Sequence, residues 1–160
     1  MMTATTLASD AFVAAYLTTA LSHDSADADG IPLDTRYGPQ HIAPDAMVQL
    51  RADCDRFYQA HADAWQAAGL HDEQAGRDLW VSRNLYTLCG FFKRHLGGGV
   101  GIALQHAAQE LRAAKLYVGA DGQLQVAYGS GPCARLHHTT DWAATAAELR
   151  RQLAARVVSA

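Results

Sequence analysis

The sequence lacks the features of several large protein classes. No run of eighteen apolar residues occurs among its 160 residues, so we expect no transmembrane helix. Its three cysteines lie far apart and form no CxxC pair, which excludes a disulfide framework and a zinc ribbon and favours a reducing cytoplasm. The first twenty residues lack a basic segment and are interrupted by Ser9 and Asp10, unlike a signal peptide. These absences predict a cytoplasmic protein with no membrane partner.

Signatures of catalysis and of cofactor binding are also missing. The sequence has no Gly-x-Ser-x-Gly elbow and no HExxH spacing, and the glycine-rich run 97–101 lacks the Gly-Lys-Ser/Thr ending of a phosphate loop. His137 and His138 are adjacent, so their side chains point in different directions in most backbones. Asp53 and Asp55 lie on different faces of a predicted helix and cannot form an acid–base dyad. We therefore expect no metal and no cofactor, and a binding protein rather than an enzyme.

The composition is that of a globular domain, with 49% apolar and 18% charged residues. A chain of this length suits one domain over 1–160. The net charge of −3 conceals an asymmetry: residues 1–80 hold twelve acidic and four basic side chains, and residues 81–160 hold four acidic and nine basic ones. Such a distribution could steer a charged partner, or the two halves could simply attract one another in the folded chain.

Apolar periodicity predicts a mainly helical α+β fold with about five helices and one β-hairpin in a single compact domain. The clearest pattern, with apolar residues three and four positions apart, lies at 44–68. An Asp-Gly turn between two β-prone runs predicts a hairpin over 115–128. An acidic loop is expected at 23–43. The helices are expected at 6–22, 44–68, 72–86, 100–114 and 140–157.

Several segments resemble, in order and spacing, a family of small uncharacterised proteins encoded by bacteriophages, prophages and related mobile elements. Those proteins carry a stretch close to DQAGHDFWLTRNGHGAGFWDR, followed later by LYVGDDG. The likeness covers roughly residues 9–126 and leaves the predicted C-terminal helix outside. It implies a mobile-element origin and no particular activity. The segments that carry it include Gly30-Ile-Pro-Leu-Asp34, Asp72-Glu-Gln-Ala-Gly76, Asp78-Leu-Trp80, Ser82-Arg-Asn84, Gly90-Phe-Phe92 and Leu116-Tyr-Val-Gly119.

The chain departs from that family pattern at two places. The His-Gly pair that follows Arg-Asn in the family is absent after Asn84, where this sequence has an extra residue before Gly90. If the family histidine performs chemistry, this chain has lost it. The family's Trp-Asp is replaced by Phe92-Lys93, so the local charge changes from acidic to basic.

The segment 83–95 combines cations, hydrogen-bonding groups and aromatic rings, and it supplies the candidate binding residues Arg83, Asn84, Phe92, Lys93 and Arg94. An arginine can bind a carboxylate or phosphate through two parallel hydrogen bonds, and an aromatic ring can stack on a base. The alternative is that the aromatic residues belong to the core and Arg83 pairs with Asp78 or another acidic residue.

Three functions remain as hypotheses. The first is a non-enzymatic accessory protein of phage or mobile-element origin that engages a host or phage macromolecule, with a protein as the expected partner. The second is a nucleic-acid-binding protein that uses the basic and aromatic segment 83–95 together with Lys115, although the negative net charge argues against it. The third is a hydrolase or transferase with a site around Arg83 and Asn84. The amphipathic helices could also form a homodimer.

Overall fold

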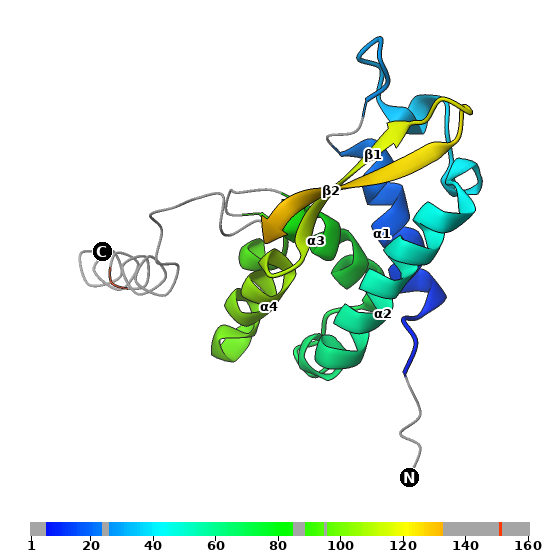
Figure 1. Cartoon of the computed structure of the whole chain (residues 1–160). Coiled ribbons are helices and arrows are strands. Elements are labelled where there is room, and N and C mark those ends of the chain that lie inside the picture. Colours follow the sequence, from blue (N-terminus) through cyan, green and yellow to red (C-terminus); the bar gives the residue numbers. More distant parts are fainter. Residues whose placement is uncertain (1–5, 24–25, 85–88, 95, 133–150, 152–160) are drawn as a thin grey trace.

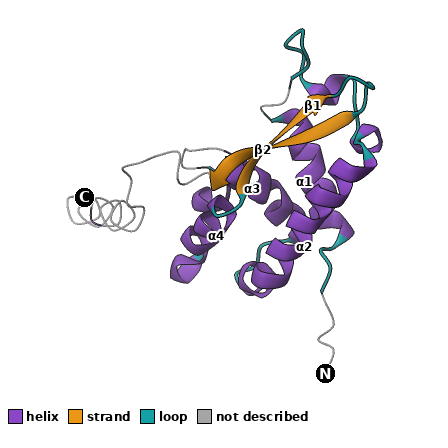
Figure 2. Ribbon diagram, viewed as in Figure 1, coloured by secondary structure: helices purple, strands orange, loops and turns teal. Residues whose placement is uncertain are grey.

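Four α-helices and one antiparallel β-hairpin form the part of the chain that our computed structural model describes, residues 6–23, 26–84, 89–94, 96–132 and 151. The expected mainly helical α+β class is confirmed. The predicted helix at 140–157 lies outside the described residues except for Arg151. No helix among the described residues is long and apolar enough to cross a membrane. The elements are α1 (Asp10–Ser22), α2 (Pro44–Ala67), α3 (Asp72–Asn84), α4 (Val100–Gln109), β1 (Arg112–Val118) and β2 (Leu124–Pro132) (Figures 1 and 2).

Local capping sets where the first two helices begin. Helix α1 begins at Asp10, later than the expected residue 6, because the Ser9 side chain caps it by accepting a hydrogen bond from the Phe12 backbone N–H at 3.3 Å. Helix α2 begins at Pro44 as predicted, since proline has no N–H to leave unpaired in the first turn.

The predicted helix over 100–114 is wrong at its C-terminal end. Helix α4 stops at Gln109, and Arg112, Ala113 and Ala114 belong to strand β1. Helix propensity favours alanine, but contacts with α3 override it: the Asn84 side chain accepts a hydrogen bond from the Ala114 N–H at 2.7 Å. Strand β2 also runs beyond the predicted hairpin, to Pro132.

Short-range contacts order residues 26–43, the main described part of the segment that was expected as a loop over 23–43. Asp27 accepts hydrogen bonds from the N–H groups of Asp29 and Ile31 and from the Arg36 side chain. Two single turns of 3₁₀-helix, Leu33–Thr35 and Pro39–His41, follow it. The Ala43 N–H then donates to the Leu124 carbonyl at 2.8 Å, which joins the end of this segment to strand β2.

The core lies between the helices, where α1 crosses α3 at close range. Gly76 permits this approach, because a Cβ atom there would lie 2.2 Å from the Phe12 carbonyl oxygen. The rings of Phe12, Phe57 and Phe91 continue the core, with Trp65 stacked between Phe12 and Phe57 at centroid distances of 5.4 and 5.9 Å. Trp80 and Phe91 also belong to the core, since both are buried.

The β-hairpin lies across the helices with one face toward them (Figure 1). Leu116 and Leu124 point to this side and are fully buried, whereas Lys115 and Tyr117 face away from the helices and are exposed. The register shifts between Arg112, which pairs with Pro132, and Ala114, which pairs with Tyr128, so the extra residues at this irregularity belong to β2. This irregular end of the hairpin lies beside α3, and the candidate site lies next to it.

Candidate functional site: a pocket between α2, α4 and the hairpin

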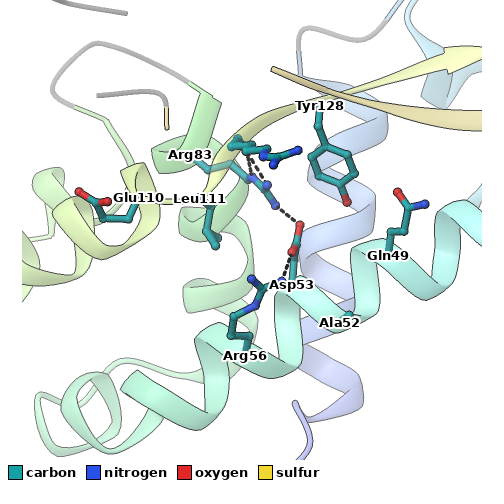
Figure 3. A pocket seen from close by; sticks show the side chains of 9 residues that line it. Gln49, Ala52, Asp53, Arg56, Arg83, Glu110, Leu111 and Tyr128 are labelled. Carbon is teal, nitrogen blue, oxygen red and sulfur yellow. Dashed lines mark hydrogen bonds and ion pairs between the residues drawn. The ribbon is translucent and has the colours of Figure 1, made fainter. Parts of the chain in front are cut away.

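A pocket of about 500 Å³ opens where helix α2, the C-terminal end of helix α3, the link from α4 to β1, and strand β2 meet. In Figure 3, Asp53 and Arg56 rise into it from α2, and the ring of Tyr128 descends from β2 on the opposite side. The residues that line it are Gln49, Ala52, Asp53, Arg56, Arg83, Glu110, Leu111, Arg112 and Tyr128. This volume is in the range of small-ligand sites.

Arg83, one of the predicted binding residues, forms the inner wall and is only 1% exposed. Its guanidinium donates to the Tyr16 hydroxyl at 2.7 Å and to the Asp53 carboxylate at 3.0 Å. It also donates from Nε and from Nη2 to the backbone carbonyl of Arg112. The guanidinium lies 5.7 Å from the centroid of the Tyr128 ring. Arg83 therefore holds α1, α2 and the start of β1 together, in agreement with the alternative that it pairs with an acidic residue, which is Asp53 and not Asp78.

Asp53 is the carboxylate at the base of the pocket, and both of its oxygens are occupied. Oδ2 accepts from Arg83, and Oδ1 accepts from Arg56 at 2.8 Å. Asp55 points elsewhere and accepts the N–H of Ala8, which confirms that the two carboxylates of this helix do not work as a pair. Asp53 therefore has little capacity left to act as a base toward a ligand.

Two donors at the pocket are not committed to the fold. The Tyr128 hydroxyl oxygen is buried, and it has no hydrogen-bond partner among the described residues. The guanidinium of Arg112, an exposed residue, makes no hydrogen bond or ion pair with another described residue. Buried polar groups are nearly always paired in folded proteins. The Tyr128 hydroxyl therefore lacks the partner that most buried polar groups have, and it shares the pocket with an arginine that is unpaired among the described residues.

The hydroxyl and thiol groups in and around the pocket stay protonated and therefore neutral. Burial raises the pKa of Tyr16 and of Cys54 well above their ordinary values. Burial, with the nearby Asp53 carboxylate adding to the effect, raises the pKa of Tyr128 to about 12. Burial opposes the charge on Arg83, but Tyr16 and Asp53 more than offset that cost and raise its pKa. The pocket wall thus carries charged guanidinium groups and one neutral hydroxyl, that of Tyr128.

The other predicted binding residues do not gather at this pocket. Asn84 accepts from the Ala114 N–H and donates to the Trp80 carbonyl, so its side chain fixes β1 on α3. Phe92 is half-buried, and its N–H donates to Gln105. Arg94 is paired with Asp78 at 2.7 Å, and Lys93 is exposed.

Sequence reasoning missed most of the pocket. Asp53, Arg112 and Tyr128 come from three separate elements, and no spacing rule links them. Arg112 was expected near the C-terminal end of a helix, and Tyr128 was expected in a simple hairpin. Neither position carries a sequence pattern that indicates ligand binding. The pairing of β1 with β2, whose register shifts next to Arg112, brings them together beside Arg83.

A second pocket of about 410 Å³ lies between α3 and the hairpin, with Tyr128 contributing to both pockets. Its walls include several small residues, Ala113, Ala114 and Ala127, and one of its polar side chains, Asn84, is already bonded to the backbone. Within the described ranges, no three His, Cys, Asp or Glu side chains come close enough to hold a metal ion. His137 and His138 lie outside the described residues.

Comparisons with known proteins found no match: no family model, no curated protein and no solved structure is similar to this chain.

Proposed function

We propose that this chain is a non-enzymatic binding protein that engages a partner protein, with the pocket between α2 and the hairpin as the contact site. The observation that carries the proposal is the pair of uncommitted donors, Arg112 and the Tyr128 hydroxyl, at the edge of a pocket whose other charged groups are largely paired. The mobile-element origin and the cytoplasmic setting stay part of this proposal. They rest on the sequence resemblance and on the scattered cysteines.

Binding fits the chemistry of the pocket better than catalysis does. A nucleophile or general base needs a pKa near the working pH. Tyr16, Cys54 and Tyr128 are shifted in the opposite direction and remain protonated. The Asp53 carboxylate is shared between two guanidinium groups. What remains for a ligand is a set of hydrogen-bond donors, which favours recognition over bond cleavage.

The nucleic-acid hypothesis has less support from the geometry. Arg83 is buried, and Arg94 is held by Asp78. Lys93 and Lys115 remain as exposed cations of the proposed set. Nucleic-acid binders neutralise several phosphates at once, so two lysines on separate elements are a small basis for such a surface. The hydrolase hypothesis loses Asn84, whose side chain is bonded to the backbone on both sides.

Site-specific photo-cross-linking tests the proposal. Gln49 on α2 lines the pocket, and Gln59 on the same helix is exposed away from it. A photoreactive residue at each position is exposed to source-cell lysate, with and without nuclease, and captured proteins are identified by mass spectrometry. We expect position 49 to capture one partner at a stoichiometric level, position 59 to miss it, and Arg112→Glu to abolish its capture.

Nuclease treatment and the Gln59 control make the result decisive. Capture of the same proteins from both positions, or capture that Arg112→Glu does not change, would contradict a contact at the pocket. Capture that disappears with nuclease would move support to the nucleic-acid hypothesis. Cross-linking of the purified chain to itself would favour the homodimer over a foreign partner.

A further inference from the structure

We infer that the pocket recognises a carboxylate group presented by a peptide, with the Arg112 guanidinium and the Tyr128 hydroxyl as its donors. This inference rests on the proposed function and gives its ligand chemistry. The charge of the lining residues and the arrangement of their hydrogen-bond donors both point to such a group.

The charges of the lining residues suit an anion with a single charge. Three guanidinium groups, on Arg56, Arg83 and Arg112, face two carboxylates, on Asp53 and Glu110. Arg83 and Arg56 already pair with Asp53, so one positive charge, on Arg112, is left without a described partner. A carboxylate would neutralise it. A phosphate dianion would bring a second negative charge beside Asp53 and Glu110, where like charges repel.

The donors also match a planar acceptor with two oxygens. A guanidinium can bind both oxygens of a carboxylate through parallel hydrogen bonds. The Tyr128 hydroxyl is buried without a partner among the described residues, and a carboxylate oxygen would satisfy it. Arg83 positions both groups, since it binds the backbone carbonyl of Arg112 and lies over the ring of Tyr128. Arg83 is thus a positioning residue, and Arg112 and Tyr128 are the contact residues.

A peptide can offer this carboxylate from two sources, an acidic side chain or its C-terminus. The pocket of about 500 Å³ has room for more than one carboxylate group, so a side chain and its neighbouring backbone both fit. The volume alone does not choose between the two sources, and the experiment separates them.

Four probes are titrated into the full-length protein and followed by the shifts of backbone amide signals in NMR spectra. The first two are acetylated Ala-Glu-Ala amide, which carries only a side-chain carboxylate, and acetylated Ala-Gln-Ala with a free C-terminus, which carries only a terminal one. The neutral acetylated Ala-Gln-Ala amide and inorganic phosphate are the controls. We expect saturable shifts at Arg112 and Tyr128 with a carboxylate peptide, and none with the neutral peptide. The stronger of the two carboxylate peptides identifies the source.

Three variants test the named donors. Because a hydrogen bond to a charged group is stronger than one between neutral groups, Tyr128→Phe should weaken carboxylate binding about tenfold or more. Arg112→Ala should weaken it by at least as much, since it removes two charge-assisted hydrogen bonds. Arg77→Ala removes an exposed guanidinium that does not line the pocket, and it should leave the affinity unchanged. Far-UV circular dichroism and the melting temperature establish that each variant is folded.

Equal binding of the neutral and carboxylate peptides, tighter binding of phosphate, or equal losses in Arg77→Ala and Arg112→Ala would overturn the inference. Absence of saturable binding by both carboxylate peptides would overturn it too. These outcomes differ from failure of the proposed function. If Gln49 still captures a partner in an Arg112-dependent way, the pocket is a contact site and only its carboxylate chemistry is wrong.

Discussion

Asp72 and Asp53 each gather side chains from several helices, but their surroundings differ. Asp72, at the start of α3, accepts four hydrogen bonds at 2.6–3.1 Å, and every donor near it has a partner. The donors are the Ser9 and Tyr58 hydroxyls, the Trp65 indole and the Gln66 amide. Asp53 accepts from Arg56 and Arg83, and the Tyr128 hydroxyl and the Arg112 guanidinium of the same pocket have no partner within the described part of the chain.

The difference between the two clusters separates polar groups that are paired within the fold from polar groups that have no partner among the described residues. Removing a paired group should destabilise the protein, because its partners lose their hydrogen bonds while they stay away from water. Removing an unpaired group should cost little or nothing. Arg83 belongs to the first kind although it lines the pocket, and Arg112 and Tyr128 belong to the second.

The largest effect is expected for Arg83→Met. This change leaves Asp53, Tyr16 and the Arg112 carbonyl without their shared donor, and breaking a buried ion pair in this way costs about 3–5 kcal/mol. Urea unfolding followed by circular dichroism measures it. Arg77→Met is the control, because Arg77 is exposed and pairs with Glu73 on the helix surface, where the loss should be at most about 0.5 kcal/mol. A similar small loss in both variants would show that Arg83 is not holding the helices together.

Asp72→Asn should have the next largest effect, a loss of about 1–2 kcal/mol at pH 7, because four hydrogen bonds to a charged acceptor are weakened. Burial alone would raise the pKa of Asp72, but the four donors more than offset it and lower it to about 2. The folded state therefore binds the proton less tightly than the unfolded state, whose value is near 3.8. This stabilisation is present above pH 4 and is lost as the pH falls from about 4 to about 2.

Urea titrations of the wild type and Asp72→Asn at several pH values measure this loss. The difference between the two proteins should be largest at neutral pH and should shrink toward pH 2. A constant difference across the acidic range would mean that the Asp72 charge does not stabilise the fold.

Tyr128→Phe and Tyr58→Phe compare an unpaired hydroxyl with a paired one. Loss of the Tyr58 hydroxyl, which donates to Asp72 at 2.6 Å, should cost about 1 kcal/mol. Loss of the Tyr128 hydroxyl should leave stability unchanged or raise it by up to about 1 kcal/mol, since a buried group without a partner is removed. Calorimetric melting temperatures of the two variants measure the contrast. A clear destabilisation by Tyr128→Phe would assign that hydroxyl to the fold.

The smallest effect on stability is expected for Arg112→Ala. The Arg83 guanidinium binds the backbone carbonyl of residue 112, which alanine retains, and exposed substitutions usually stay within about 0.5 kcal/mol. Urea unfolding of this variant under the conditions used for Arg83→Met gives the value. A loss above about 1 kcal/mol would show that the side chain is committed to the structure.

The elements could largely be predicted from the sequence, because they depend on local signals. The apolar period of α2, the proline at its first turn and the Asp-Gly turn of the hairpin all operate within a few residues. The end of α4 could not be predicted, since Asn84, thirty residues away along the chain, fixes Ala114 in a strand. Local propensity cannot anticipate a contact of that range.

The candidate site was predictable only in part. Arg83 stands out in the sequence because it lies among aromatic residues, and the structure does place it in the wall of the pocket. Its partner Asp53 carries no local sign, and neither does Tyr128, whose importance comes from a hydroxyl left without a partner among the described residues. Such a property exists only after the chain has folded.

The most direct test of the account compares Arg112 with Arg83 in one sample. The side-chain Nε–H signals of ¹⁵N-labelled protein are followed in NMR spectra while acetylated Ala-Glu-Ala amide and the acetylated Ala-Gln-Ala acid are added in turn. We expect the Arg112 signal to shift and saturate with at least one of these peptides. The Arg83 signal should stay in place, because its Nε–H is already bonded to a carbonyl at 2.9 Å. An unmoved Arg112 signal, or equal shifts at all exposed arginines, would contradict a carboxylate site at this pocket.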